Sequence, residues 1–346
     1  MITKCLVLGA WCLVLVLACP NAASAALTEG PRLAAVYDAI LDARFEQADA
    51  QLEQACPPAP EGACQVLHLV SLWWQIQINP ESRSLDPRFS SLAASTIAAN
   101  DAWVRREPRR AEAWFYLAAA YGPRVQWRIL RGERIAAARD GKRIKDALER
   151  AIELDPTLYD AYFGIGLYHY YADVAPAALK MLRWLLLLPG GDRVQGLSEM
   201  LQARDRGELL AGEADFQLHL IYLWYEKKTT DALNLLERLE ARYPHNPIFR
   251  QRIAEIRDVY VHDPAASAAA WQMLLDRALA GTVYSPRTTE VRARLGLASV
   301  LSALNRTSEA IMHLQRIVDM RPTEPIGARE RAERELRAAL ARNARR

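Results

Sequence analysis

The chain has 346 residues, of which 51% are hydrophobic and 25% charged, and its formal net charge at pH 7 is only +3. The composition is that of a globular protein, and so small a charge argues against nucleic acid as the partner. Because single cores rarely grow beyond about 250–300 residues, this length favours a stack of repeats, in which each unit contacts only its neighbours.

The first 25 residues have the pattern of a secretory signal peptide. Lys4 precedes an apolar run from Cys5 to Cys19, and the small residues 23–25 form a cleavage site. The run is shorter than the roughly 20 apolar residues that a membrane-spanning helix needs. We therefore expect an exported protein of the periplasm or cell envelope, and the alternative is a lipoprotein processed at Cys19.

Beyond this leader, apolar residues recur every three to four positions, which is the period of an amphipathic α-helix. Strand-like alternation of useful length is absent, so the expected fold class is all-α. The first helices are predicted over 33–43, 45–55, 64–78 and 87–106. We expect one array from 26 to 346, made of N-terminal pairs (26–110), central repeats with inserted helices (111–212), C-terminal repeats (213–326) and a basic capping helix (327–346).

Two cysteines remain after cleavage, Cys56 and Cys64, and they bracket a proline-rich loop between two predicted helices. In an exported chain this spacing is typical of a disulfide that joins two helix ends, and the alternative is a pair of free buried thiols. Neither another Cys nor a His lies close enough in sequence to complete a ligand set, so we expect no metal site and no cofactor.

Residues 144–171 contain the end of one helix pair and the start of the next. Asp155-Pro156 ends one helix, and the following helix carries Ile165-Gly166 among aromatic residues. The spacing resembles that of tetratricopeptide (TPR) repeats. The resemblance implies a TPR-like α-solenoid, a right-handed superhelix of antiparallel helix pairs, and a compact all-α bundle is the alternative. One repeat carries about 14 residues more than the template between Tyr121 and Ile144, so its helices are lengthened or a connector is inserted.

Residues 163–201 have a more specific pattern. A glycine-containing aromatic helix leads into a Pro-initiated apolar helix over 177–188, which we expect to be buried between neighbours, with a membrane-surface or partner-docking helix as the alternative. A third helix begins after a turn. The turn and this helix carry Gly191, Asp192, Arg193, Gly196 and Leu197.

This order of features resembles the inclusion-body-clearance family of TPR proteins, in which a G-D-R-x-x-G-L motif occurs. The resemblance implies a non-enzymatic adaptor, but those relatives are intracellular, so their cellular role is not transferred. From the residues alone, Asp192 is placed to cap the third helix and Arg193 to pair with a carboxylate. A ligand contact by these two residues is the alternative.

The TPR resemblance also implies that the first helix of each pair lines a concave wall. Aromatic area beside an acid on such a wall suits an extended or helical peptide. The corresponding residues are Asp160, Phe163, Leu167, Tyr170 and Tyr171, with Glu112 and Phe115 in the preceding repeat.

A basic segment over 124–145 holds eight basic and two acidic residues, which gives a local charge of +6. Arg124, Arg128 and Arg131 share one helical face. This face is either a solvated surface or an electropositive site for acidic peptides or anionic lipid headgroups.

Catalytic motifs are not evident in the sequence. None of the six His lies in a metalloprotease motif or beside a Cys pair, and no phosphate-binding loop, dinucleotide turn or nucleophile elbow occurs. The expected function is a non-enzymatic exported scaffold or adaptor that binds a protein or peptide partner. The alternatives are an envelope-anchored lipoprotein or peripheral membrane assembly or transport factor, and an enzyme whose site is assembled in space.

Overall fold

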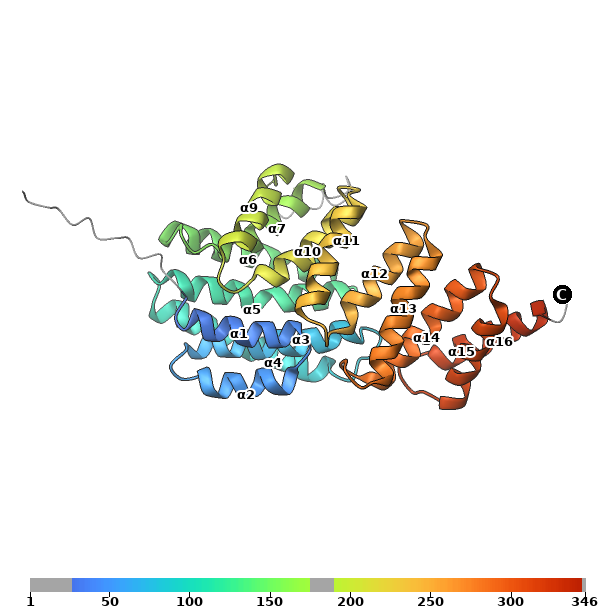
Figure 1. Ribbon diagram of the computed structural model, residues 1–346. Helices are drawn as coiled ribbons and strands as arrows, with labels where there is room; N and C mark the ends of the chain where they lie inside the picture. Colours follow the sequence, from blue (N-terminus) through green and yellow to red (C-terminus); the bar gives the residue numbers. More distant parts are fainter. Residues whose placement is uncertain (1–26, 175–189, 344–346) are drawn as a thin grey trace, which may run out of the picture.

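The computed structural model describes residues 27–174 and 190–343 (Figure 1). Within these ranges it has fifteen α-helices and no strand, so the predicted all-α class is confirmed. The predicted signal peptide, Cys19 and the predicted apolar helix 177–188 lie outside the described residues. The helices are α1 Gly30–Leu41, α2 Phe45–Ala55, α3 Glu61–Ile78, α4 Asp86–Arg106, α5 Ala111–Leu130, α6 Arg134–Leu154, α7 Ala161–Val174, α9 Arg193–Arg206, α10 Ala211–Trp224, α11 Thr229–Arg242, α12 Pro247–Val259, α13 Pro264–Leu279, α14 Pro286–Ala303, α15 Thr307–Met320 and α16 Ala328–Asn343.

Proline and capping side chains fix where several helices begin. Proline occupies the first turn of α1, α4, α12, α13 and α14, where a missing N–H costs nothing because that group has no partner within the helix. Asn246 accepts a hydrogen bond from the backbone N of Ile248 at 3.1 Å, and Asp263 accepts one from Ala266 N at 2.9 Å. These starts set the boundaries of the C-terminal helix pairs.

Helices pack mainly against their neighbours in the chain, as in other repeat proteins. The pairs are α5 with α6, α7 with α9, α10 with α11, α12 with α13, and α14 with α15 (Figure 1). The predicted TPR-like α-solenoid is confirmed. In the α5–α6 pair, α5 has 20 residues and α6 has 21, with a short turn between them. The extra residues therefore lengthen both helices, by about 10 Å each at 1.5 Å per residue.

The array also folds back on itself, which differs from the nearest-neighbour stack expected from the sequence. Asp38 of α1 accepts a hydrogen bond from Tyr243 Oη at 2.6 Å, and Asp42 accepts one from the backbone N of His245 at 3.0 Å. These bonds join positions 205 and 203 residues apart. The curvature of the array brings α1 beside the α11–α12 junction, so the N-terminal pairs brace the C-terminal repeats.

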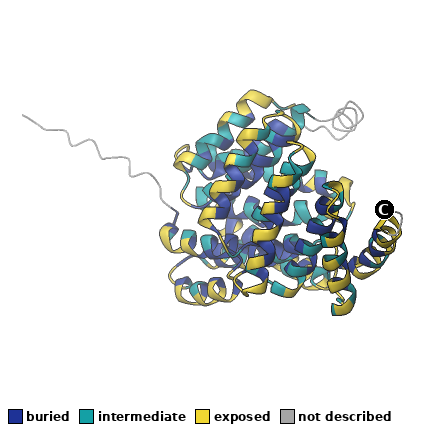
Figure 2. Cartoon of the chain, turned by 45° about the vertical axis from the view of Figure 1, so that its right-hand side comes forward, coloured by how far each residue is buried: buried dark blue, intermediate teal, exposed yellow. Residues whose placement is uncertain are grey.

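Buried apolar side chains form a core along the array, and exposed residues cover its outside (Figure 2). Its aromatic centre lies where α3 meets α10 and α12. The ring centroid of Phe216 is 5.0 Å from that of Trp74 and 5.8 Å from that of Phe249. Trp74 and Phe249 are fully buried. This contact holds α12 in place relative to the N-terminal pairs.

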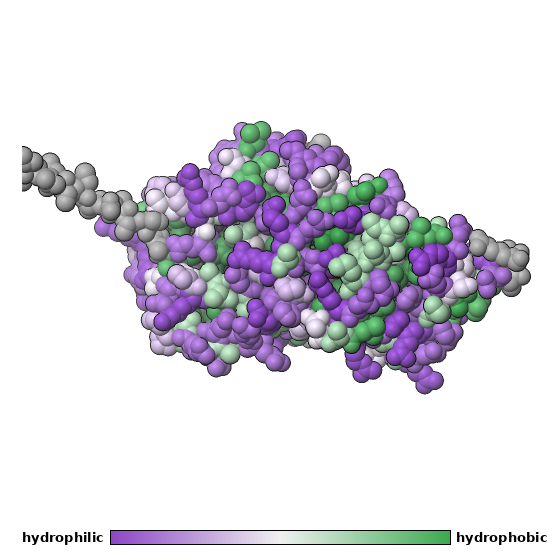
Figure 3. Space-filling model, viewed as in Figure 1, coloured by the Kyte–Doolittle hydropathy of each residue, from purple (hydrophilic) through white to green (hydrophobic). Residues whose placement is uncertain are grey.

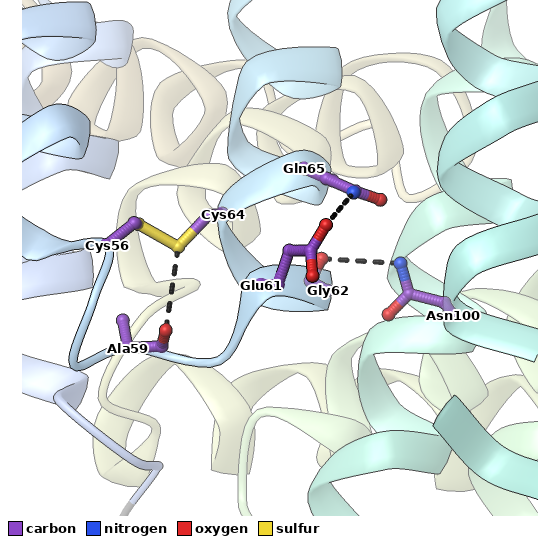
Figure 4. Close-up of a disulfide and its surroundings, with 7 residues drawn as sticks. All are labelled: Cys56, Ala59, Glu61, Gly62, Cys64, Gln65 and Asn100. Atoms are coloured by element: carbon purple, nitrogen blue, oxygen red, sulfur yellow. Dashed lines mark hydrogen bonds between the residues drawn. A yellow bond between two sulfur atoms is a disulfide. The ribbon is translucent and has the colours of Figure 1, made fainter. Parts of the chain in front are cut away.

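The predicted disulfide between Cys56 and Cys64 is present and joins the end of α2 to the start of α3 (Figure 4). The two Cα atoms are 6.4 Å apart. Next to it, Gly62 lies under α4, where a Cβ atom would be 2.6 Å from Asn100 Oδ1. Asn100 Nδ2 donates to the Gly62 carbonyl oxygen at 3.3 Å. The bridge therefore closes a loop that is already packed against α4.

Candidate functional site

An open groove of about 390 Å³ lies between α12 and α14 in the C-terminal half of the array. The start of α16 and the α3–α4 loop also line it. Figure 3 shows hydrophobic residues reaching the surface over α12 to α14 among hydrophilic ones. Since α12 pairs with α13 and α14 with α15, the groove is formed mainly by the first helices of two successive pairs.

The α12 wall of the groove follows from helical spacing. Glu255, Asp258 and Val259 face the groove, because residues three and four positions apart lie on one side of a helix. The opposite side carries the buried Ile253 and Ile256. Those two residues hold α12 against the core and leave its polar side open.

An apolar floor lies beneath this wall. Trp271 of α13 and Leu295 of α14 line it and are only 6% and 7% exposed. Gly296 allows the indole to lie against α14, because a Cβ at that position would be 2.3 Å from a ring carbon of Trp271. A larger residue at position 296 would displace the floor.

One end of the groove is fixed by contacts between distant segments. Arg292 of α14 donates to Asn79 Oδ1 at 2.9 Å and pairs with Glu81, both in the α3–α4 loop. Asn79 Nδ2 donates to Glu324 Oε2 at 3.0 Å. The loop is therefore attached to α14 and to the segment before α16, and it cannot swing freely over the groove.

The groove combines exposed apolar side chains with a carboxylate that lacks a partner. Val259 and Ile326 are 59% and 60% exposed. Within the described part of the chain, the Asp258 side chain makes no hydrogen bond or ion pair, whereas the groove's Arg292 is already held by Glu81. The arrangement can hold an apolar side chain next to a cationic one.

The acids predicted to face a partner have structural bonds instead. Asp160 is 2% exposed and accepts hydrogen bonds from the backbone N of Glu208, Leu209 and Leu210 at 2.8, 3.0 and 2.8 Å, just before α10. Burial raises the pKa of Asp160, and these backbone bonds only partly oppose the rise. Glu112 accepts hydrogen bonds from Thr28 N and from Arg110, and so attaches the start of the described chain to α5.

The aromatic wall predicted on α5 and α7 is covered. Phe115 and Tyr170 are 2% and 0% exposed. Phe163, Leu167 and Tyr171 are half-buried in a cluster with side chains of α9 and α10. Phe115 and Tyr170 are therefore core residues rather than part of an open wall, and a role for Phe163, Leu167 and Tyr171 in partner binding stays a prediction.

The three arginines predicted to form an electropositive face are engaged in internal ion pairs. Arg124 Nε and Nη2 each lie 2.8 Å from an oxygen of Asp140, and Arg128 pairs with the same carboxylate. Arg131 donates to Asp86 at 2.8 Å. Partial burial would raise the pKa of Asp86, but hydrogen bonds from Arg131 and Trp127 outweigh it and hold that pKa below its ordinary value. The three arginines share one helical face, as their spacing predicted. Their charges, however, pair with Asp140 and Asp86 and so stabilise the α5–α6 hairpin and the start of α4.

Asp192 caps α9 and Arg193 pairs with a carboxylate, which are the structural roles that the residues indicated. Asp192 Oδ1 accepts hydrogen bonds from the backbone N of Val194 and Gln195 at 2.8 and 2.9 Å, which caps α9. Arg193 Nε lies 2.9 Å from Glu226 Oε1 of the α10–α11 turn. The other motif residues pack α9 on α7: Gly191 and Gly196 lie against its backbone, and Leu197 is half-buried in the same cluster.

Metal and membrane features were also sought in the two described ranges. No group of three or more His, Cys, Asp or Glu side chains there is placed to hold a metal ion. Among the described helices, none is long and apolar enough to cross a membrane.

No protein-family model matches the chain, and no curated protein matches its sequence. Among solved structures, the chain is similar to the human IFIT1 dimer with PPP-AAAA, at 13% identity and a TM-score of 0.44 over 88% of this chain and 69% of that chain. It is also similar to a monomeric IFIT1 mutant with Gppp-AAAA (12%, TM-score 0.43, 86% and 68%) and to the APC/C hetero-tetramer Cut9–Hcn1 (13%, TM-score 0.36, 86% and 59%). The resemblance of residues 163–201 to inclusion-body-clearance proteins stays a prediction.

Proposed function

We propose that this protein is a non-enzymatic scaffold that holds a peptide segment of a protein partner in the α12–α14 groove. The observation that carries the proposal is the placement of the unpaired Asp258 beside the exposed Val259, with Ile326 across the groove. An apolar side chain of the partner would lie between Val259 and Ile326, above the Trp271 floor. A Lys or Arg of the partner would pair with Asp258.

Physical arguments support a peptide as the ligand. Binding energy at protein interfaces is concentrated in a few buried anchors, and the surrounding contacts exclude water. A groove formed by packed helices is preorganised, so little entropy is lost in ordering it. The fixed α3–α4 loop strengthens this effect, because Arg292 attaches it to α14 before any partner arrives.

We also propose that the protein works in the periplasm or cell envelope. Support comes from the signal-peptide pattern of residues 1–25, and the alternative is lipid attachment at Cys19. The intact mass of the protein isolated from its native cells separates the two. A chain beginning near residue 26 supports export in soluble form, a lipid-modified Cys19 supports the lipoprotein, and an uncleaved chain contradicts both.

The peptide-binding proposal can be tested by selection from a random peptide display library. The wild-type protein is expected to enrich peptides that combine one large apolar residue with a nearby Lys or Arg. Val259→Arg should abolish the enrichment, and Asp258→Lys should shift the preference from basic to acidic peptides. Met312→Arg, at a residue of α15 that is 63% exposed and outside the groove, is the matched control and should select like the wild type. Selection of no common peptide, or equal selection by Val259→Arg, would contradict the proposal.

A further inference from the structure

The tip of the α5–α6 hairpin exposes aliphatic side chains. Ile129, Leu130 and Ile135 are 59%, 40% and 56% exposed, and all three lie within seven consecutive positions. A single exposed apolar residue is ordinary, but a group of them at one place indicates an interaction surface. The peptide groove lies elsewhere and includes none of these residues.

The tip is rigidly placed rather than loosely packed. Trp127 Nε1 donates to Asp86 Oδ1 at 3.0 Å, and Arg131 Nε donates to Asp86 Oδ2 at 2.8 Å. Arg131 Nη1 also donates to the carbonyl oxygen of Pro80 at 2.8 Å. These bonds hold one side of the α5 end against α4 and the α3–α4 loop. The aliphatic side chains are on the part of the turn that these contacts leave open.

Two unpaired cationic side chains, Arg134 and Arg139, lie close in sequence to the aliphatic residues. Ile135, Arg139 and Arg143 recur every four positions, so they share one face of α6. Neither Arg134 nor Arg139 forms a side-chain hydrogen bond or ion pair in the part of the chain that the structure describes. Arg143 on the same face has a 60% exposed side chain, but it is engaged: it donates to Tyr121 Oη at 3.3 Å and pairs with Asp140 at 3.8 Å, so it is not part of the proposed surface.

We propose that Ile129, Leu130, Arg134, Ile135 and Arg139, here called the tip surface, bind the surface of an anionic lipid bilayer. The aliphatic side chains would enter the boundary between headgroups and acyl chains, as the apolar faces of interfacial helices do. The guanidinium groups would donate hydrogen bonds to lipid phosphates, with which Arg pairs in bidentate geometry.

A lipid surface fits these residues better than a second peptide. The aliphatic groups lie at the turn between two long helices, α5 of 20 residues and α6 of 21, beside the α3–α4 loop. Exposed aliphatic side chains beside the unpaired Arg134 and Arg139 match an anionic lipid interface, to which apolar and cationic groups can bind together. The exposed acid of the turn, Glu133, lies 3.6 Å from Arg128, which reduces its repulsion of a negative surface.

Vesicle binding tests the proposal. The protein, with the N-terminus that its cells leave on it, is floated with vesicles of phosphatidylglycerol and phosphatidylcholine or of phosphatidylcholine alone. We expect binding to the anionic vesicles that weakens at least about tenfold in Arg134→Gln/Arg139→Gln, since each of the two basic residues near such a surface contributes roughly fivefold. Ile129→Gln/Ile135→Gln should weaken it similarly. Met312→Gln, at an exposed apolar residue on α15, should bind like the wild type.

A second readout isolates the tip from any membrane contact made by the N-terminus. A photo-crosslinking amino acid is placed at Leu130, and at Met312 in a matched control, and lipid adducts are measured by mass spectrometry. Lipid adducts at Leu130 and none at Met312 are expected. Absence of binding to anionic vesicles, or bound protein without a lipid adduct at Leu130, would overturn the proposal. Neither result bears on the separate proposal that the α12–α14 groove binds a peptide.

Discussion

Gly166 of α7 and Gly196 of α9 lie in direct backbone contact. A Cβ atom on Gly196 would be 2.5 Å from the carbonyl oxygen of Gly166, and one on Gly166 would be 2.7 Å from that of Gly196. Real Cβ atoms do not approach a backbone oxygen so closely. The two helices therefore pack without an intervening side chain, which only glycine at both positions allows.

Gly196→Ala should destabilise the protein by about 1–3 kcal/mol, because α9 must move away from α7 to accommodate one methyl group. Gly166→Trp should destabilise it more. Thermal unfolding measured by circular dichroism checks both. The control is Gly122→Ala in α5, where a Cβ atom would meet nothing within 4 Å and alanine favours the helix. Equal melting temperatures for Gly196→Ala and wild type would refute the close crossing.

Cys56→Ser/Cys64→Ser should lower the stability of the fold by about 2 kcal/mol. The bridge joins residues 8 positions apart, and closing so short a loop removes only a modest part of the unfolded chain's entropy. Unfolding in urea with and without reductant measures the effect. Reductant should destabilise the wild type and leave the double variant unchanged. A wild type with two titratable thiols and no response to reductant would exclude the disulfide.

Asp160→Ala should destabilise the protein by about 3 kcal/mol. The substitution leaves the backbone N–H groups of residues 208–210 without their acceptor at the start of α10, and hydrogen bonds to a charged group are among the strongest in proteins. Hydrogen exchange should show faster opening of α10. Asp155→Ala, which removes a carboxylate that bonds only the exposed Thr157, is the control. Similar unfolding free energies for the two variants would contradict this role.

Glu213 should make stability depend on pH. Burial raises the pKa of this carboxyl, and hydrogen bonds from Gln217 and Tyr37 offset only part of the rise. A raised folded-state pKa gives stability that is complete below the ordinary value of 4.5 and is lost as pH rises through the folded pKa. The advantage of Glu213→Gln over wild type should therefore grow between pH 4 and neutrality, by about 1.4 kcal/mol for each unit of pKa shift.

Urea unfolding of both proteins at several pH values measures this difference. Glu330→Gln, at an exposed position of α16, serves as the control for loss of one negative charge. A constant difference between Glu213→Gln and wild type across the range would show that Glu213 does not titrate differently on folding.

The helices could be predicted from sequence because their signals are local. The first helix, predicted over 33–43, is Gly30–Leu41, and the second has the predicted limits of Phe45–Ala55. Apolar spacing and prolines at helix starts determine these limits. The disulfide could likewise be predicted from the sequence, because its two cysteines are close in the chain and close one short loop.

The candidate groove could not be predicted, because it depends on contacts between distant segments. Spacing showed which residues of α7 share a face, but not that α9 and α10 cover Tyr170. Likewise it aligned Arg124 and Arg128 but did not show that Asp140 pairs with both. The groove brings together α12, α14 and the α3–α4 loop. One local signal was available. Val259, Tyr260 and Val261 lie at the end of α12 and just after it. A segment exposed only to solvent usually carries polar residues, whereas these three are largely apolar and exposed.

The central claim, that the α12–α14 groove holds a protein partner, is tested most directly by photo-crosslinking in the native cells. The crosslinking residue replaces Ile326 in the groove or Leu340 on α16, both of which are exposed. We predict one discrete protein adduct from position 326, lost in the Val259→Arg background, and no such adduct from position 340. Absence of an adduct from position 326, or the same adducts from both positions, would contradict the claim.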